Sequence, residues 1–366
     1  MGSLQTTFAD PRPAGRLTAS GGPDGEARAF DDLRRVADAI EEAFPDLLTL
    51  AVIGAFGRGE GAMVRTEAGV APWNDYDLLL VTPTRGGWER ISAVCRELKT
   101  RLGLPGIDIV PFTPKDLVRA ADTMLVHDAR AGHHVIRGDG STLAALPARS
   151  VARREALILL LNRMVCLLEC PPRDLTGLPE DPLRFPSQVS KAVMAVIDAA
   201  LVRAGEYAVT YREKVARFKS LAPGDVLVPA AEDALSFRFE PGPRQWDPGL
   251  WHLAGARLLD AIGEFVGCPG SQAERTGRRL WRDRFRPVRH TARSLLRGRL
   301  PDARRRAVEC AEVLVLAASR REGEERAEML REARGFIERS APMPPFTDWH
   351  QAARLTVGRW FEICYG

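Results

Sequence analysis

No apolar stretch of this 366-residue chain reaches the length of a membrane span. The longest, Ala156 to Cys170, is interrupted by Asn162 and Arg163 and falls short of the ~20 residues that a spanning helix needs. Residues 1–28 contain no apolar run behind a basic start, so they do not have the pattern of a secretory leader. We therefore expect a cytoplasmic protein without membrane contacts, with residues 1–28 forming a flexible tail.

Cysteine follows no repeated spacing, although the chain contains six of these residues. With no secretory leader, this scatter argues against a disulfide framework and indicates reduced thiols. Cys166 and Cys170 are four residues apart in a predicted helix, but no second Cys or His pair with ligand spacing completes a four-ligand zinc site. We expect no structural zinc.

Lysine is scarce, since it accounts for five of the 52 basic residues. The net charge of +4 is small, so charge alone favours neither nucleic acid nor a membrane surface as partner. Thirteen arginines lie between Arg275 and Arg306, against two aspartates. Apolar residues interleave with them at helical spacing, which favours a solvated helix face; a surface for anionic ligands is the alternative.

The hydrophobic share of 45% is enough for a full core, and the patterns in the N-terminal part indicate a small mixed α/β sheet. Apolar residues recur at three- and four-residue spacing over 27–44 and again over 88–102, which predicts two helices. Thr113-Pro114 is typical of a helix start. Short apolar runs predict buried strands at residues 47–53, 76–81, 106–112 and 134–137.

Strand patterns almost disappear beyond residue 150, and helical periodicity replaces them. Five helices are predicted, over residues 151–170, 189–204, 250–266, 304–320 and 324–339. We expect surface connectors at 171–187 and 221–248, because both are rich in Pro and Gly. The predicted domains are thus an α/β (α+β) domain over 29–148 and a large all-helical region over 149–366, with a possible break within 221–248.

Three acidic residues and a glycine-rich turn carry the chemical information. The turn from Gly54 to Gly61 follows a predicted strand, where glycines let backbone N–H groups approach phosphate oxygens. Asp75 and Asp77 open the next strand at positions i and i+2, so their side chains share one face. Asp108 interrupts a third, otherwise apolar strand, where an unpartnered carboxylate is costly. Together they predict a site for Mg²⁺, which prefers oxygen ligands.

Gly54-Ala55 through Glu60, Asp75-x-Asp77 and Asp108 resemble the motifs of the DNA polymerase β-like nucleotidyltransferase superfamily, particularly its minimal and kanamycin nucleotidyltransferase-like branch. The resemblance covers roughly residues 30–145. It implies a nucleotidyltransferase domain in which Asp75, Asp77 and Asp108 bind two Mg²⁺ ions, while Gly54 holds the triphosphate. Asp108 would also accept the proton of the attacking hydroxyl.

Two features depart from the family pattern. Ala55 stands where the family usually has serine, so backbone N–H groups or Arg58 must replace one hydroxyl contact to phosphate. The spacing from Gly54 to Asp75 is longer than in minimal members, which implies an inserted loop over residues 62–73. Arg58 and Lys191 are candidate phosphate contacts, with a surface ion pair and simple solvent exposure as the respective alternatives.

The resemblance implies an enzyme that transfers a nucleoside monophosphate, with AMP expected, from a nucleoside triphosphate such as ATP to a hydroxyl group, releasing pyrophosphate. A small-molecule acceptor is favoured over a protein, and nucleic acid is not expected. The alternative is a catalytically inactive nucleotide-binding sensor or partner-binding protein on the same fold. The three carboxylates argue against this alternative, because their mutual repulsion costs stability without a metal.

Overall fold

The computed structural model describes residues 15–84, 88–268, 275–276, 279–280, 303–338 and 343–365. The chain divides into two compact units. The first comprises Met1–Glu155 together with Ala204–Leu221 and Leu235–Gly242, and the second comprises Ala156–Arg203, Ala222–Ala234 and Pro243–Gly366. Segments from the second half of the chain therefore complete the first unit.

A four-stranded mixed sheet forms the centre of the first unit, which confirms the predicted mixed α/β class. Its strands are β1 (Thr49–Ile53), β4 (Tyr76–Val81), β5 (Ile107–Phe112) and β6 (His134–Gly138), in the order β5-β4-β1-β6. β1 is antiparallel to both β4 and β6, whereas β4 and β5 are parallel. The parallel pair is joined by α3 (Trp88–Leu102), the crossover helix that such a connection requires.

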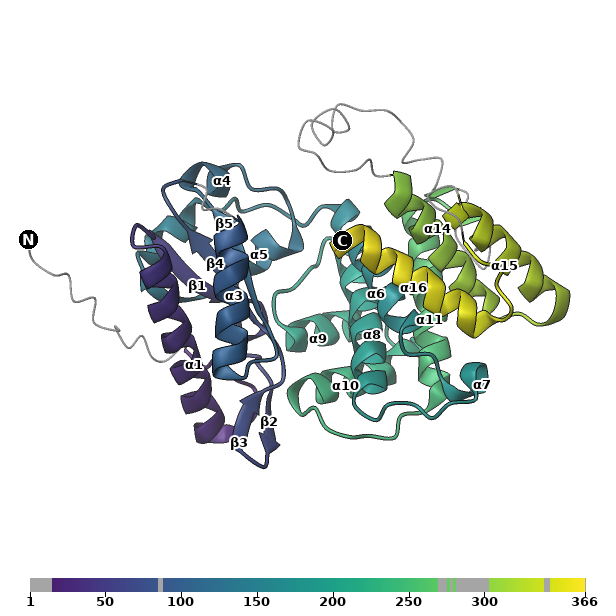
Figure 1. Ribbon diagram of the computed structural model, residues 1–366, viewed down its shortest axis with the longest axis horizontal. Coiled ribbons are helices and arrows are strands. Elements are labelled where there is room, and N and C mark those ends of the chain that lie inside the picture. Colours follow the sequence, from purple (N-terminus) through teal and green to yellow (C-terminus); the bar gives the residue numbers. More distant parts are fainter. Residues whose placement is uncertain are drawn as a thin grey trace, which may run out of the picture. The chain divides into compact units, whose positions relative to one another are not determined.

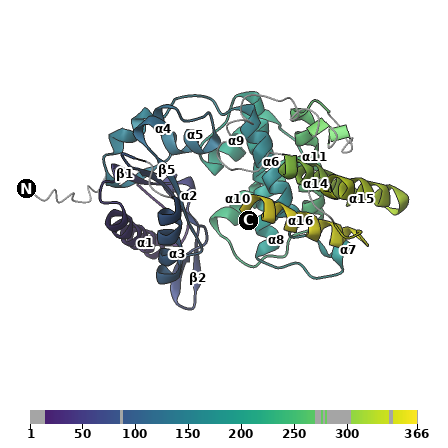
Figure 2. The same cartoon turned by 45° about the horizontal axis from the view of Figure 1, so that its top comes forward.

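Helices cover both faces of this sheet (Figures 1 and 2). α1 (Gly22–Ala43) and α3 cover one face, where their apolar stripes pack on the side chains of Leu50, Val52, Leu78 and Leu80. The short helices α4 (Pro114–Val118) and α5 (Met124–Ala131) cover the other, together with the 3-10 turn η1 (Gly140–Ala145). The central strands β1 and β4 are almost entirely buried, which explains why they are apolar runs in the sequence.

Three parts of the first unit differ from the prediction. α1 begins at Gly22, within residues 1–28, which were expected to form a flexible tail. The expected loop at 62–73 contains a β-hairpin, formed by β2 (Met63–Thr66) and β3 (Gly69–Pro72). Its turn uses Gly69 at a φ of 115°, a conformation that favours glycine. The glycine-rich turn after β1 contains one short helix, α2 (Gly54–Gly57).

The predicted connector at 221–248 is also wrong, because it contains α10 (Leu227–Phe239), which follows α9 (Tyr211–Leu221). The prolines suggested a loop there. Pro229 lies in the first turn of α10, where a missing backbone N–H costs nothing. The end of α10 and all of α9 belong to the first unit.

The second unit is helical, as the periodicity predicts. Its helices are α6 (Arg153–Leu168), α7 (Arg173–Thr176), α8 (Arg184–Ala204), α11 (Pro248–Phe265), α14 (Ala303–Ala318), α15 (Gly323–Glu338) and α16 (Trp349–Tyr365). Trp251 and Trp349 are buried and donate their indole N–H groups to the carbonyls of Leu167 and Val315, at 3.0 and 2.7 Å. These tryptophans are core residues. Most of the basic stretch from Arg275 to Arg306 lies outside the described residues.

α8 is the one helix within the described ranges that has the length and apolar character of a membrane span. However, 78% of its most apolar 18-residue window is buried inside the protein. A helix that is apolar all round is expected at the centre of a helical unit.

Glu312 on α14 is fully buried, and neither of its carboxylate oxygens has a hydrogen-bond partner in the part of the chain that the structure describes. Burial, and then the charge of Glu309, raises the pKa of Glu312 well above its usual range, while Arg305 opposes the shift. The folded state therefore binds the proton more tightly than the unfolded chain does. The stability of this unit is expected to fall as the pH rises above the unfolded pKa.

Glu312→Met is expected to stabilise the second unit by about 1–3 kcal/mol at pH 8, because it removes a buried polar group that lacks a partner. The gain should shrink as the pH falls towards 5, because protonation of Glu312 removes its buried charge. Thermal unfolding at both pH values measures the effect, with the exposed Glu328→Gln as control. A gain that is the same at both pH values would contradict the assignment of the cost to the charge.

Candidate functional site

The sheet register places Asp77 of β4 directly beside Asp108 of β5. Asp75 lies one residue before β4, so it shares the face of Asp77 two positions away. This face is the one covered by α4 and α5, because Leu79 and Val81 of the same strand pack in their core. Neighbouring strands are about 5 Å apart, so the pairing brings two carboxylates together from separate segments of the chain.

The glycine-rich turn contacts this carboxylate pair. Ile53, the last residue of β1, pairs with Asp77, and Gly54 follows with a φ of 66°. A Cβ atom at position 54 would lie 2.1 Å from Oδ2 of Asp77, a distance that no side chain can occupy. Gly54 is therefore required on two grounds, its backbone conformation and the close approach of the Asp77 carboxylate.

Gly106 has the same relation to Asp75 at the start of β5. A Cβ atom there would lie 3.1 Å from Cβ of Asp75, and the Tyr76 N–H donates to the Gly106 carbonyl at 3.1 Å. Glycine is thus required at position 54, whereas a side chain at position 106 would be crowded by Asp75.

The charges of the three carboxylates act on one another. Burial raises the pKa of Asp77 to about 7, and the charges of Asp75 and Asp108 add to this shift, while Arg58 and Arg238 oppose it. Burial and the charge of Asp75 likewise raise the pKa of Asp108, with Lys99 acting in the opposite direction. A cation at this site would relieve the mutual repulsion.

The residue types of the three acids suit a hard divalent cation, but their side chains do not form a ready metal-binding group in this structure. Within the described ranges, no three His, Cys, Asp or Glu side chains stand in an arrangement that could hold a metal ion. Asp77 is partly buried and accepts no hydrogen bond from any described residue, so its oxygens remain available as ligands. Carboxylate oxygens are the ligands that Mg²⁺ takes in proteins.

Ala55 is the second residue of α2 and is buried. As an alanine, it offers no hydroxyl to a phosphate. The Arg58 N–H donates to the Gly54 carbonyl at 3.2 Å and closes the turn around these residues. Any phosphate contact of Gly54 or Ala55 would thus come from their backbone.

The Arg58 side chain is 4% exposed and lies between two acids. Its Nη1 donates to Oδ2 of Asp128 at 3.2 Å, and its Nε lies 3.7 Å from Oε2 of Glu60. Burial disfavours the charged form, but Tyr211, Asp128 and Glu60 outweigh burial, so the pKa of Arg58 is raised. Arg58 is thus in an ion pair, but in a buried one and not in the surface ion pair expected as the alternative. Its phosphate role stays a prediction.

Arg58 belongs to a cluster that joins the turn after β1 to α5, α9 and the end of α10. We define this tyrosine cluster by its members, which are Arg58, Glu60, Asp128, Tyr207, Tyr211, Lys214 and Arg238. Glu60 accepts from the Tyr211 N–H at 2.8 Å, at the start of α9. Lys214, which is 3% exposed, donates to the Tyr207 hydroxyl at 3.0 Å and lies 4.5 Å from the centre of that ring.

Arg238 is a member of the cluster that the sequence analysis did not single out. It lies in a segment that was expected to be a connector, and its relation to residues near position 58 is purely tertiary. A compositional signal did exist for its neighbours. Tyr207, Tyr211 and Lys214 place two of the four tyrosines and one of the five lysines of the chain within eight residues.

Lys191, the other predicted phosphate contact, lies on α8 of the second unit. Its side chain is partly buried and has an interaction partner. Its role towards a phosphate stays a prediction.

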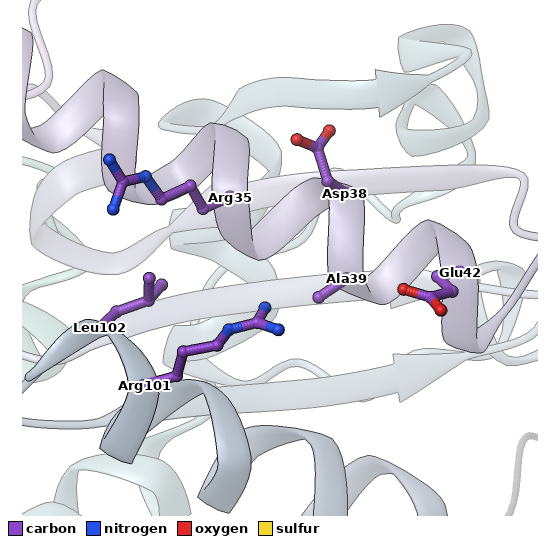
Figure 3. Close-up of a pocket in the computed structure, with 6 residues that line it drawn as sticks. All are labelled: Arg35, Asp38, Ala39, Glu42, Arg101 and Leu102. Carbon is purple, nitrogen blue, oxygen red and sulfur yellow. The ribbon is translucent and has the colours of Figure 1, made fainter.

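A separate hollow of about 340 Å³ lies between α1 and α3. Figure 3 shows Arg35, Asp38, Ala39 and Glu42 along α1, with Arg101 and Leu102 on α3. Both arginines already have partners, since Arg35 pairs with Asp31 at 2.7 Å and Arg101 pairs with Glu97 at 3.4 Å. This hollow has mixed charge and none of the features of the carboxylate site.

Comparison of the chain with protein-family models and with curated proteins found no match to either. The functional argument therefore rests on the residues and their geometry.

Proposed function

We propose that this protein is a metal-dependent nucleotidyltransferase, which transfers a nucleoside monophosphate from a nucleoside triphosphate to a hydroxyl group and releases pyrophosphate. One observation carries the proposal. Asp77 is paired with Asp108 in the sheet while its carboxylate packs against Gly54, so the acidic residues and the glycine turn form one site. The proposal includes the finer fold assignment, in which the sheet with α1 to α5 is a nucleotidyltransferase domain.

Asp75, Asp77 and Asp108 would hold two Mg²⁺ ions. When bound, these ions would lower the pKa of the acceptor hydroxyl and neutralise the charge of the triphosphate and pyrophosphate. The residues of the chain have two tasks. They position the carboxylates on adjacent strands, and they accept a proton.

Asp108 is the proposed proton acceptor. Asp108 is exposed on β5. Partial burial of its carboxylate and the charge of Asp75 raise its pKa, which makes it a stronger base than an ordinary aspartate. The hydroxyl oxygen of the acceptor forms a bond to the α-phosphorus, the bond to the bridging oxygen of pyrophosphate breaks, and the hydroxyl proton moves to a carboxylate oxygen of Asp108. ATP is the proposed donor, and a small molecule is the proposed acceptor.

Thermal unfolding with each nucleoside triphosphate, with and without Mg²⁺, tests the proposal. Binding raises the apparent stability by about RT ln(1 + [L]/Kd), so ATP at a hundredfold excess over Kd is expected to add about 2.7 kcal/mol in the presence of Mg²⁺. Pyrophosphate release with a panel of hydroxyl acceptors then measures turnover. The proposal is overturned if no triphosphate stabilises the protein and none is turned over.

A nucleotide sensor without catalytic activity is the second candidate, and Ala55 favours it. Position 55 lacks the hydroxyl, and Arg58 is held by two acids, so the turn offers fewer phosphate contacts than the family pattern implies. Stabilisation by a triphosphate without turnover on any acceptor would favour the sensor.

A further inference from the structure

We propose that Arg238 binds the phosphate chain of the nucleotide, and that Tyr211 and Glu60 are positioning residues that hold it there. This inference rests on the proposed function, because it assigns a substrate contact of the same site. The sequence analysis gave the phosphate role to Arg58 in the glycine-rich turn. The inference gives it instead to an arginine about 180 residues further along the chain.

The charges within the tyrosine cluster distinguish Arg238 from its other cations. Glu60 and Asp128 contact Arg58 directly. Asp128 also accepts from the Tyr207 hydroxyl at 3.4 Å, and that hydroxyl in turn accepts from Lys214. Two acids therefore balance Arg58 and Lys214, and Arg238 is the third cation.

The contacts of Arg238 are with a neutral side chain. Its guanidinium carbon lies 4.1 Å from the centre of the Tyr211 ring, and its Nη2 donates to the Tyr211 hydroxyl at 2.5 Å. Its Nε is buried without a hydrogen-bond partner among the described residues. A guanidinium has five N–H donors in a planar fork that matches phosphate oxygens, and the Tyr211 hydroxyl takes one of them.

Tyr211 is itself held from the turn that follows β1. Its backbone N–H donates to Glu60, and the guanidinium carbon of Arg58 lies 5.0 Å from the centre of its ring. Arg58 also closes α2 on Gly54, the residue against which the Asp77 carboxylate packs. Arg238 is thus connected to the acidic residues through two side chains.

Isothermal titration with sodium tripolyphosphate in the presence of MgCl₂ tests the inference on the full chain without turnover. Arg238→Gln is expected to weaken tripolyphosphate binding about tenfold to a hundredfold, the range for hydrogen bonds to a charged group. Arg238→Lys should retain part of the affinity, because an ammonium keeps the charge but not the fork. Tyr211→Phe should weaken binding less than Arg238→Gln does.

Arg212→Gln is the matched control. Arg212 also stacks on an aromatic ring, with its guanidinium carbon 4.3 Å from the centre of Phe239, and it is exposed. Its loss is expected to change the affinity by less than twofold. In turnover assays, Arg238→Gln should raise the KM for the nucleotide, whereas a purely structural role would lower the amount of folded enzyme at unchanged KM.

Wild-type affinity in Arg238→Gln would overturn the inference, as would a wild-type protein that does not bind tripolyphosphate. If Arg238→Gln fails to fold, phenylglyoxal modification of the wild type decides the question. Tripolyphosphate should protect Arg238 but not Arg212, and equal modification with and without it would overturn the inference. Arg238-dependent binding without pyrophosphate release from any nucleotide would instead contradict the proposed function alone.

Discussion

Asp77→Asn is expected to reduce pyrophosphate release roughly a thousandfold or more, because it removes a charged ligand from the centre of the proposed metal site. Asp77 is the residue that joins the three parts of the site. It pairs with Asp108 across the sheet, packs on Gly54 and has its pKa raised by Asp75. A discontinuous assay for pyrophosphate with ATP, Mg²⁺ and the best acceptor measures the loss.

The same substitution is expected to stabilise the metal-free protein. The pKa of Asp77 is raised to about 7 in the folded state, against about 4 for an unfolded aspartate. The charged form is therefore disfavoured by folding, and its cost grows as the pH rises from about 4 to 7. In EDTA at pH 8, Asp77→Asn should gain roughly 2–4 kcal/mol, and the gain should decrease towards pH 5.

Asp46→Asn, at an exposed position before β1, is the control for both measurements and should change neither. Activity that survives Asp77→Asn would show that the carboxylate pair is not the metal site. If Asp77→Asn loses both activity and much of its stability, Asp77 supports the fold. This result would contradict its assignment as a metal ligand.

Arg58→Met is expected to destabilise the first unit by about 3–5 kcal/mol, the usual cost of removing one partner from a buried ion pair. The substitution leaves Glu60 and Asp128 without their cation while the methionine side chain fills part of the same space. Because the chain has two units, a single unfolding midpoint is ambiguous. Hydrogen exchange in peptides covering α2, α5 and α9 measures the loss where it is expected.

Arg34→Met is the matched control, because Arg34 pairs with Asp31 at the surface and its side chain is 57% exposed. Such pairs contribute about 0–1 kcal/mol. If Arg58→Met were as stable as the wild type but no longer bound tripolyphosphate, Arg58 would be the phosphate contact and the structural interpretation would be wrong.

Much of the sheet could be predicted because its strands are short apolar runs that end at glycine or proline. The prediction at Thr113-Pro114 succeeded for a local reason as well. Thr113 accepts from the Asp116 N–H, and Asp116 accepts from the Thr113 N–H, which is a complete capping box. The hairpin at residues 63–72 was missed because its strands have four residues each and only Met63 and Pro72 are buried, so no apolar run marks them.

The ion-pair role of Arg58 could not be predicted from the sequence. Arg58 lies between two glycines, a position that is also typical of an arginine that binds phosphate. Its partner Asp128 is 70 residues away, and Tyr211, which stacks near it, is further still. Sequence spacing predicts neighbours within one element or between adjacent strands. It gives no information on which distant segment covers a turn.

The positions of the strands along the chain, the glycine turn and the three acidic residues were determined by the sequence itself, because apolar period, backbone freedom and carboxylate chemistry are local properties. The tertiary structure decided the rest. It set the register that places Asp77 beside Asp108, the close packing of Asp77 on Gly54, and the return of α9 and the end of α10 to the first unit. Those features depend on hydrogen bonds and charges between segments far apart in the chain, and these contacts exist only once the chain has folded.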